Sequence, residues 1–495
     1  MKMVKSLLLG SAAGVVAVAG TQAADLPVKA RPVEYVKICT LYGAGFYYIP
    51  GTDICLKVGG YVRSDYGWNV TGARTVQYTG APGAQDRSVS PWSTRHRAHF
   101  DFDSRTQTAY GTLRTFVAIH IDNENQGTVT VNPQRAFIQW AGFTFGHTKS
   151  FTDTPGTFAT GDDTFRSLFQ TQNQSDTGAN GTNQIAYTWE LGNGMTLSLG
   201  ADERRVKPIA NLSINVTTVG SNPTSSMHGE QYPNPWVNFA VNQAWGRLGL
   251  SFIGNPNHAS YYQGFPVACT QPQTDLCQYP SDKWGWAVLS GIDVKAPWLG
   301  PGDHFGGYAN FGQGAVAYSG GSNLNSPGLF GSGSPFNTVA NGVVTDAVYI
   351  NGSGLQLTTA WTVGVGYEHF WLPNFSTTWY GNYTEVSYND TVINNRWFCN
   401  GVPNNTVPQN FAIPGNVACD PGFKFWTVGS HTDWYPVPNF RLAVDVLYTH
   451  IDTAFDGASI SLSKAQGARH TGFYTAKDDG ILAVVFRAQR SFGGN

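Results

Sequence analysis

The amino-acid sequence predicts an all-β protein, specifically a 16-stranded antiparallel transmembrane β-barrel with an inward-folded third loop. Two patterns lead to this prediction: apolar and polar residues alternate along the chain, and short turns alternate with long polar connections. Composition is the third observation. Charged residues make up 13% of the 495 residues, about half of the roughly 25% of ordinary soluble domains, whereas aromatic residues reach 14%.

The chain begins with the features of a secretory signal peptide at residues 1–23. Two lysines precede an apolar stretch from Leu7 to Ala19, and small residues ending at Ala23 provide a cleavage site. A membrane anchor is the alternative, but this stretch is too short to cross a hydrocarbon layer of about 30 Å. We therefore expect a mature chain that starts with a periplasmic N-terminal segment at residues 24–54.

The six cysteines fall into three local couples, which are Cys39 with Cys55, Cys269 with Cys277, and Cys399 with Cys419. An even number of cysteines after a signal peptide fits disulfide bonds in an oxidising compartment. Pairing within each couple is a preference, because six thiols allow 15 connectivities. A zinc site is the alternative, but no CxxC occurs and no histidines cluster nearby, so we expect no metal and no cofactor.

Period-two alternation is clearest in three segments, residues 56–68, 93–103 and 110–121. In each of them one face is apolar, as with Val62 and Phe100, and the other is charged or polar, as with Arg63 and Asp101. Helical spacing explains none of these segments, whereas strand alternation explains all three.

Connections of two kinds follow one another strictly along the chain. Seven short ones are predicted at 104–108, 141–142, 191–194, 243–246, 295–303, 370–374 and 434–439. Eight long ones are predicted at 69–91, 122–133, 151–183, 206–235, 255–282, 319–356, 389–422 and 452–478. Together they predict 16 strands in a barrel over residues 55–492, followed by a short extension at 493–495.

Whether the apolar face points outward or inward distinguishes a membrane barrel from a soluble β-sheet protein. A secreted soluble β-sandwich that binds carbohydrate is the main alternative, and it would turn a polar face outward. Here the more uniform face is bulky and apolar, and the charged face carries Arg, Asp and Thr, as in outer-membrane barrels. Backbone groups in hydrocarbon need internal partners, so such a sheet has to close.

Several segments resemble the general porins of alpha-proteobacteria. The resemblance is carried by the run from Gly45 to Arg63 with Cys39 upstream, by Arg135 to Gly142, and by the turns at Trp371 and Trp434. It implies a homotrimer in the outer membrane of a Gram-negative bacterium, with a third loop folded into each pore. The chain departs from the family at its end, because Phe492 is followed by Gly493, Gly494 and Asn495.

The third long connection, about residues 151–183, is the expected pore constriction. It carries three acidic residues, Asp153, Asp162 and Asp163. Opposite them we expect a basic wall on the lumen face of the strands, formed by Arg63, Arg95, Arg97, Arg114 and Arg135. Opposed charges would create a transverse field in the narrow zone. The competing interpretation for each arginine is a structural ion pair with Asp65, Asp101 or Asp103 on the same wall.

The expected function is passive diffusion of small hydrophilic solutes and ions, without catalysis. A net charge of −2 without basic blocks argues against nucleic-acid binding. HExxH, Walker A and G-x-S-x-G motifs do not occur, and a barrel-embedded hydrolase would need a Ser/His pair that the strands do not offer. The expected partners are outer-membrane lipid, two further copies of this chain, and the solutes.

Overall fold

The computed structural model describes most of the barrel and parts of its loops. The described residues are 37–70, 90–156, 167–169, 177–178, 181–205, 207–213, 227–262, 278–320, 342–398, 411–412, 419–457, 459–462, 472–475 and 477–493. The predicted signal peptide at 1–23, the extension residues 494–495, and Asp162, Asp163, Cys269, Cys277 and Cys399 lie outside this part. In the described part, no helix is long and apolar enough to cross a membrane.

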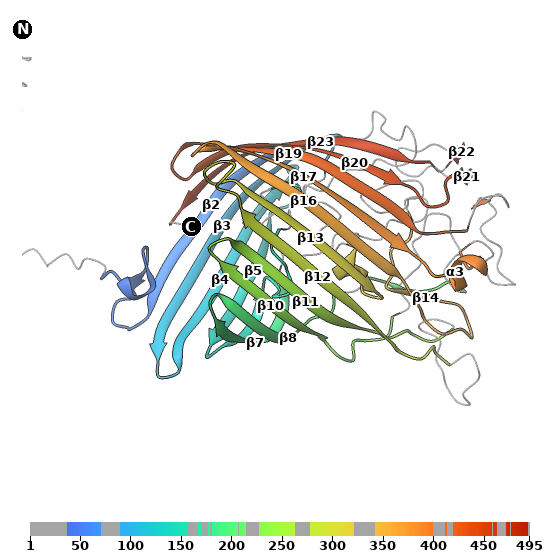
Figure 1. The fold of residues 1–495 in the computed structure, drawn as a ribbon, viewed down its shortest axis with the longest axis horizontal. Helices are drawn as coiled ribbons and strands as arrows, with labels where there is room; N and C mark the ends of the chain where they lie inside the picture. The colour runs from blue at the N-terminus through green and yellow to red at the C-terminus, as the bar shows by residue number, and fades with distance from the viewer. Residues whose placement is uncertain are drawn as a thin grey trace, which may run out of the picture.

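Sixteen strands of the described chain form one closed antiparallel barrel (Figure 1). They are β2 (Cys55–Trp68), β3 (Trp92–Thr108), β4 (Gly111–Glu124), β5 (Thr130–Trp140), β6 (Phe143–Thr148), β7 (Thr182–Gly192), β8 (Met195–Asp202), β10 (Asn234–Gln243), β11 (Gly246–Asn257), β12 (Lys283–Lys295), β13 (His304–Gln313), β16 (Thr359–Leu372), β17 (Phe375–Ser387), β19 (Phe423–Val437), β20 (Phe440–Asp452) and β23 (Asp479–Phe492). Closure comes from β2, which pairs with β3 on one side and with β23 on the other. The β-sandwich alternative is therefore wrong, because a sandwich keeps open sheet edges.

The strand count and the alternation of short and long connections are confirmed. Several boundaries differ from the prediction by a few residues, and the first two connections are examples. The first turn does not lie at residues 104–108, because β3 continues to Thr108 and the chain turns at residues 109–110. The second long connection is shorter than 122–133, because β4 extends to Glu124 and β5 begins at Thr130. Polar residues at strand ends resemble turns, although here they continue the strands β3 and β4.

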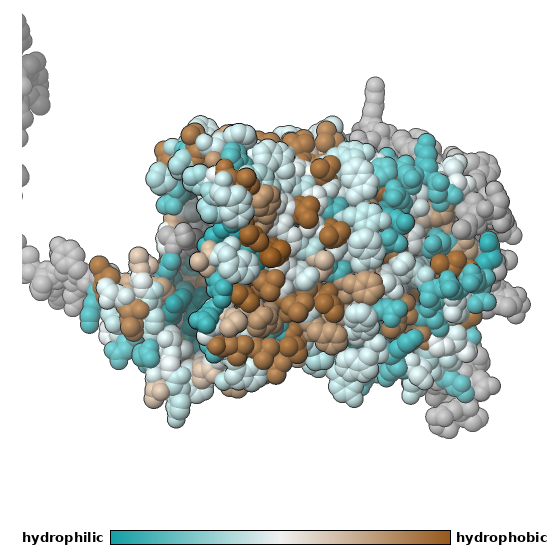
Figure 2. All heavy atoms as spheres, viewed as in Figure 1, coloured by the Kyte–Doolittle hydropathy of each residue, from teal (hydrophilic) through white to brown (hydrophobic). Residues whose placement is uncertain are grey.

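The outer wall of the barrel is apolar, as predicted. Val62, Phe252 and Val365 point outward and are 57%, 54% and 64% exposed. Figure 2 shows hydrophobic side chains spread over the middle of the wall, with hydrophilic ones concentrated at the end that carries the long connections. Inward neighbours such as Arg63 and Asp65 are buried. A wall with this inverted polarity fits a hydrocarbon surrounding.

Small elements lie in the connections. These are the 3-10 helix η1 (Thr40–Tyr42), β1 (Tyr47–Tyr48), β9 (Ile209–Asn211), α2 (Val316–Ser319), β14 (Ala347–Tyr349), β15 (Gln356–Leu357), α3 (Asp390–Asn394), β18 (Phe411–Ala412), β21 (Ser459–Leu462) and β22 (Gly472–Thr475). Strands β9, β14 and β15 form one small sheet, and β18, β21 and β22 form another. Strand β1 pairs with the start of β2.

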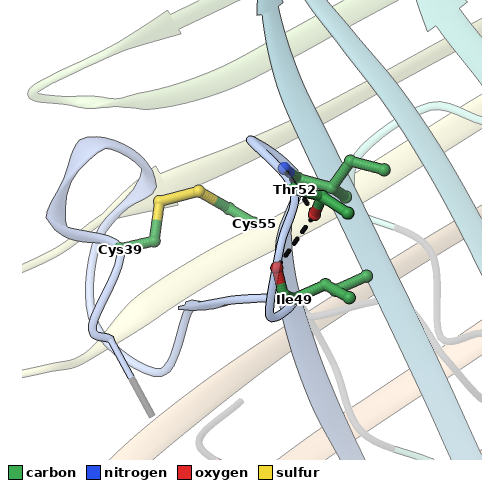
Figure 3. Close-up of a disulfide and its surroundings, with 5 residues drawn as sticks. Cys39, Ile49, Thr52 and Cys55 are labelled. Carbon is green, nitrogen blue, oxygen red and sulfur yellow. Dashed lines mark hydrogen bonds between the residues drawn. A yellow bond between two sulfur atoms is a disulfide. The ribbon is translucent and has the colours of Figure 1, made fainter.

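Residues 37–54 form a compact hook at the end of the barrel that carries the short turns (Figure 1). A disulfide between Cys39 and Cys55 ties the hook to the first residue of β2 (Figure 3). The side chain of Thr52 donates to the carbonyl of Ile49 at 3.0 Å and closes the turn before Cys55. One of the three expected couples is thus present. Cys419 is also disulfide-bonded, and its partner lies outside the described residues.

Strand β23 ends at Phe492, whose ring lies against Phe100 at a centroid distance of 6.2 Å. The next residue, Gly493, has a φ of 78° and packs against the backbone of β2. A Cβ atom at Gly493 would collide with the carbonyl oxygen of Val58, so only glycine fits this position.

Candidate pore and constriction

The connection between β6 and β7 crosses the inside of the barrel. We refer to residues 149–181 as the crossing segment. Its base is fastened by Asp153, which accepts hydrogen bonds from the backbone and the side chain of Thr177 at 2.9 and 2.5 Å. Arg205, just after β8, lies 3.6 Å from the same carboxylate. These contacts bring the two ends of the segment together.

The position of Asp153 differs from the expectation. Its side chain is fully covered at the base of the segment, 0% exposed, and lies 3.6 Å from Arg205; of the predicted basic wall, Arg135 interacts with it electrostatically. Burial raises the pKa of Asp153, despite the opposing attraction of Arg205 and Lys149. Asp153 therefore holds the two ends of the segment together, and its carboxylate is covered from solutes.

From its base the crossing segment runs along the inner faces of β11 and β12. Pro155 passes directly over Gly249 and Gly291, and a Cβ atom at Gly291 would collide with the carbonyl oxygen of Pro155. Gly156 has a φ of 83°, and a side chain there would collide with the backbone of β12. Glycine on both sides of the contact lets two backbones approach closely.

The far part of the segment is fixed to the opposite wall. The backbone N–H of Leu168 donates to Asp445 of β20 at 2.7 Å, and the Ser167 hydroxyl donates to the same carboxylate at 3.1 Å. Tyr380 of β17 donates to the other oxygen of Asp445 at 2.7 Å. Leu168 and Phe169 are fully buried beside these residues. The inward fold of the third loop is thereby confirmed. Asp162 and Asp163 lie in the part of the segment outside the described residues.

The predicted basic residues all lie inside the barrel on neighbouring strands β2 to β5. Arg95 donates two hydrogen bonds to Asp65, at 3.1 and 2.9 Å, and Arg63 lies 3.6 Å from it. A third arginine, Arg487 of β23, donates to Asp65 at 2.6 and 3.2 Å. Three guanidinium groups thus share one buried carboxylate, with Glu124 3.7 Å from Arg95.

The remaining arginines of this wall also have partners. Arg97 binds Asp122 through two hydrogen bonds of 2.5 and 2.7 Å. Arg114 and Arg105 both bind Asp103, each through two hydrogen bonds. Arg135 differs, because it donates to the carbonyl of Gly178 in the crossing segment at 2.8 Å. Pairing with Asp65, Asp101 or Asp103 on the same wall was the competing interpretation of these arginines, and it describes the geometry of Arg63, Arg95 and Arg114.

Sequence reasoning missed Arg487 and Arg105 as members of this wall. Arg487 alternates with outward Phe486 and Ala488, so the period-two pattern of β23 contains the signal. Arg105 lies in the stretch 104–108, which was predicted as a turn and not as part of a strand. The wall also carries Tyr61 and His99, whose rings stack at 4.7 Å.

Part of the barrel interior is apolar, which the alternation of the strands did not predict. Inward residues of β17, β20 and β23, such as Tyr380, Leu447 and Val485, pack with Leu168, Phe169 and loop residues in one buried cluster. The cluster extends to Val316 of α2 and Val348 of β14. Loops therefore cover the inner face of the strands late in the chain, whereas the arginine-rich wall belongs mainly to β2 to β5.

Asp346 connects the loops in this filled region. It is fully buried and accepts from the backbone N–H groups of Lys207 and Val316, both at 2.8 Å. Burial raises the pKa of Asp346 to about 6, although Lys207 and Arg204 oppose the shift. Burial also lowers the pKa of Lys207 to about 8. The pair holds the connection after β8 against the connection after β13.

Potential metal ligands occur together at one place in the described part of the chain, His450, Asp452 and Asp478, with ligand atoms within 4.8 Å of one another. His450 lies 3.2 Å from Asp452, and Asp478 accepts from the backbone of Thr453 at 2.8 Å. The contacts of these three side chains are with other protein groups, so their position needs no metal ion to explain it.

A closed barrel with an apolar outer wall, a polar inner wall and a loop across its lumen defines an outer-membrane channel protein. The sequence comparison makes this more specific, because residues 25–483 match the family model described as the Porin subfamily. The chain belongs to this family, and its place is the outer membrane of a Gram-negative bacterium.

Individual relatives agree with the family. Porin Omp2b of Brucella canis is 36% identical over 321 residues, which cover 59% of this chain and 81% of that protein. Porin Omp2a of Brucella melitensis is 32% identical over 318 residues, covering 59% and 82%. Among solved structures, the outer membrane channel DcaP of Acinetobacter baumannii superposes with a TM-score of 0.53 at 16% identity, over 90% of this chain and 99% of that one. This last likeness supports the fold alone.

Proposed function

We propose that this porin passes small hydrophilic solutes and ions by passive diffusion, with no catalytic step. One observation carries the proposal: the crossing segment leaves the wall between β6 and β7 and is bound to Asp445 on the opposite wall. A barrel of 16 strands is wide enough for an aqueous channel, and a segment placed across it limits the size of what passes.

Liposome swelling tests this function. Vesicles that contain the purified protein are placed in isotonic solutions of neutral solutes of increasing size. Swelling is expected for small solutes and a sharp decline for larger ones, because the crossing segment narrows the lumen. Vesicles that stay impermeable to every solute, with the barrel folded, would contradict the proposal.

The charged residues of the pore are proposed to set ion selectivity. Arg63, Arg95, Arg97, Arg114 and Arg135 are assigned to the basic wall, and Asp162 and Asp163 to the acidic side. The distances support a wall with positive excess around Asp65, where three arginines meet one carboxylate. Asp153 is assigned to the base of the crossing segment, which its covered carboxylate supports.

A homotrimer is proposed as the assembled form. Support comes from polar groups on the outer face of β2 and β3, where the side chains of Ser64 and His96 form a hydrogen bond of 3.0 Å. This is a Ser/His pair on one outward face, which corrects the expectation that the strands offer none. Polar side chains in contact with hydrocarbon are costly, so another protein surface is the better neighbour for this patch. A patch shared by symmetric copies fits a closed oligomer.

The targeting assignments remain part of the proposal. Residues 1–23 are assigned as a cleaved signal peptide, and residues 24–54 as a periplasmic segment. Residues 37–54 of this segment lie at the short-turn end of the barrel, and short turns face the periplasm in outer-membrane barrels. N-terminal sequencing of the purified protein is expected to begin at Ala24.

A further inference from the structure

An open cavity of about 750 Å³ lies beside the base of the crossing segment, at the short-turn half of the barrel. Its floor is the inner face of neighbouring strands from β4 to β11, and residues 148–155 form its upper border. Because the loop cluster fills the lumen beside β17, β20 and β23, this cavity belongs to the open part of the interior.

The cavity wall is lined by uncharged polar side chains from several adjacent strands. Thr112, Gln139, Thr188 and Thr196 are partly exposed along it. A second layer of more deeply buried groups supports them, since Thr188 shares a hydrogen bond of 2.9 Å with Ser198 and Gln139 donates to Thr144 at 3.2 Å. The partly exposed groups therefore have defined positions.

Charged residues are sparse on this wall compared with the arginine wall of β2 to β4. Lys149 lies at its upper border and Glu190 at its lower end, and between them the accessible groups are hydroxyls and an amide. Arg63, Arg95 and Arg97 occupy inward positions of the neighbouring strands β2 and β3, and Arg114 of β4 donates to Gln139 at 3.0 Å. Along the inner wall, a charged sector on β2 to β5 thus gives way to a sector of uncharged polar groups toward β8. We call the cavity lining the hydroxyl wall; its partly exposed members are Thr112, Gln139, Thr188 and Thr196.

We propose that the hydroxyl wall is a path for uncharged polyhydroxylated solutes such as saccharides. This inference rests on the proposed channel function and names a solute class for it. A solute that enters a narrow zone gives up hydrogen bonds to water and needs replacements. Threonine hydroxyls both donate and accept, so they can replace water for a sugar in many orientations.

The test uses the full-length protein with Thr112, Thr188 and Thr196 replaced together. Threonine to valine keeps the side-chain shape and removes the hydroxyl, whereas threonine to serine keeps the hydroxyl and removes a methyl group. Entry of a disaccharide at low concentration is measured by liposome swelling, and conductance is measured in potassium chloride. The single variants Thr188→Val and Thr196→Val provide the same comparison if the triple variant folds poorly.

The valine triple variant is expected to slow disaccharide entry by about threefold, because weaker hydrogen bonding lowers occupancy of the path. The serine triple variant is expected to keep the wild-type rate, and both are expected to keep the wild-type conductance. Equal disaccharide rates in all three proteins would overturn the inference, as would a valine variant whose conductance falls in the same proportion. A wild-type protein that conducts no ions would instead refute the channel function itself.

Discussion

The backbone N–H of Leu168 donates a 2.7 Å hydrogen bond to the carboxylate of Asp445, although 277 positions separate the two residues in sequence. Asp445 is fully buried and also binds the hydroxyls of Ser167 and Tyr380. One carboxylate thus fixes the far part of the crossing segment to the wall. Leu168 and Phe169, which are fully buried in the adjacent hydrophobic cluster, add packing to this attachment.

Replacing Asp445 by asparagine should release the crossing segment for part of the time. Hydrogen bonds to charged groups contribute about 1.5–3 kcal/mol, so weakening one of them raises the detached population about tenfold or more. Single-channel recordings should then show frequent steps of higher conductance. Asp303→Asn is the matched control, because this buried carboxylate accepts hydrogen bonds from Tyr367 and from the backbone of Phe370, outside the crossing segment. Quiet recordings from Asp445→Asn would show that Asp445 does not hold the segment.

Selectivity should depend on the acidic residues that remain on the crossing segment. The double variant Asp162→Asn and Asp163→Asn is expected to lower the preference for cations, seen as a shift of reversal potential under a salt gradient. Asp153→Asn is the control and should leave the reversal potential unchanged, because the carboxylate of Asp153 is covered. An unshifted potential in the double variant would remove Asp162 and Asp163 from the pore.

Asp65 should be a major stabilising residue of the barrel interior. Its replacement by asparagine leaves Arg63, Arg95 and Arg487 close together with one carboxylate fewer, and losing one partner of a buried ion pair typically costs about 3–5 kcal/mol. Arg63→Gln should cost much less, because Arg63 lies 3.6 Å from Asp65 and the other two arginines keep their contacts. Thermal unfolding in detergent measures the loss of stability in each of the two variants. Equal stability of the two variants would contradict this account of the cluster.

Stability should depend on pH through Asp346. Its pKa is about 6 in the folded protein and about 3.9 in an unfolded chain, so between these values the folded state binds more protons. Stability therefore falls as pH rises from about 4 to about 6, by roughly 2–3 kcal/mol. Lys207, with a pKa of about 8, adds the opposite slope above pH 8.

The comparison of wild type with Asp346→Asn isolates this contribution. Melting temperatures are measured between pH 4 and pH 7, and the difference between the two proteins should change mainly below pH 6. A difference that stays constant over this range would mean that Asp346 has an ordinary pKa.

The position of the subunit interface can be measured with spin labels. Labels at His96→Cys on β3 should lie closer to one another within a trimer than labels at Ile292→Cys on β12, which is on the opposite side of the barrel. Pulsed dipolar spectroscopy gives both distances. A shorter distance between labels at position 292 would contradict a subunit interface at β2 and β3.

Much of the barrel could be predicted from the sequence because strand alternation is a local property. Val62 and Arg63 are adjacent, and their opposite environments follow from the pleat of the strand alone. Turn positions were less predictable. Polar residues at 104–108 resembled a turn, but Arg105 points into the lumen, and the chain turns only after Thr108.

Long-range contacts could not be predicted in the same way. Nothing near Asp153 in sequence indicates that Arg205 will cover it, and nothing near Leu168 points to Asp445. The buried hydrophobic cluster inside the barrel is partly indicated by the sequence. In the run from Ile481 to Phe486, both faces of β23 are apolar. A strand that is apolar on both faces predicts cover on its inner side, although it does not predict which loop supplies that cover.

The most direct test of the channel is the conductance of the purified protein in a planar lipid bilayer. An aqueous lumen bounded by the arginine wall and the crossing segment predicts stable stepwise current increases that scale with salt concentration. A correctly folded protein that inserts into the bilayer and carries no current would contradict the open lumen on which the whole interpretation depends.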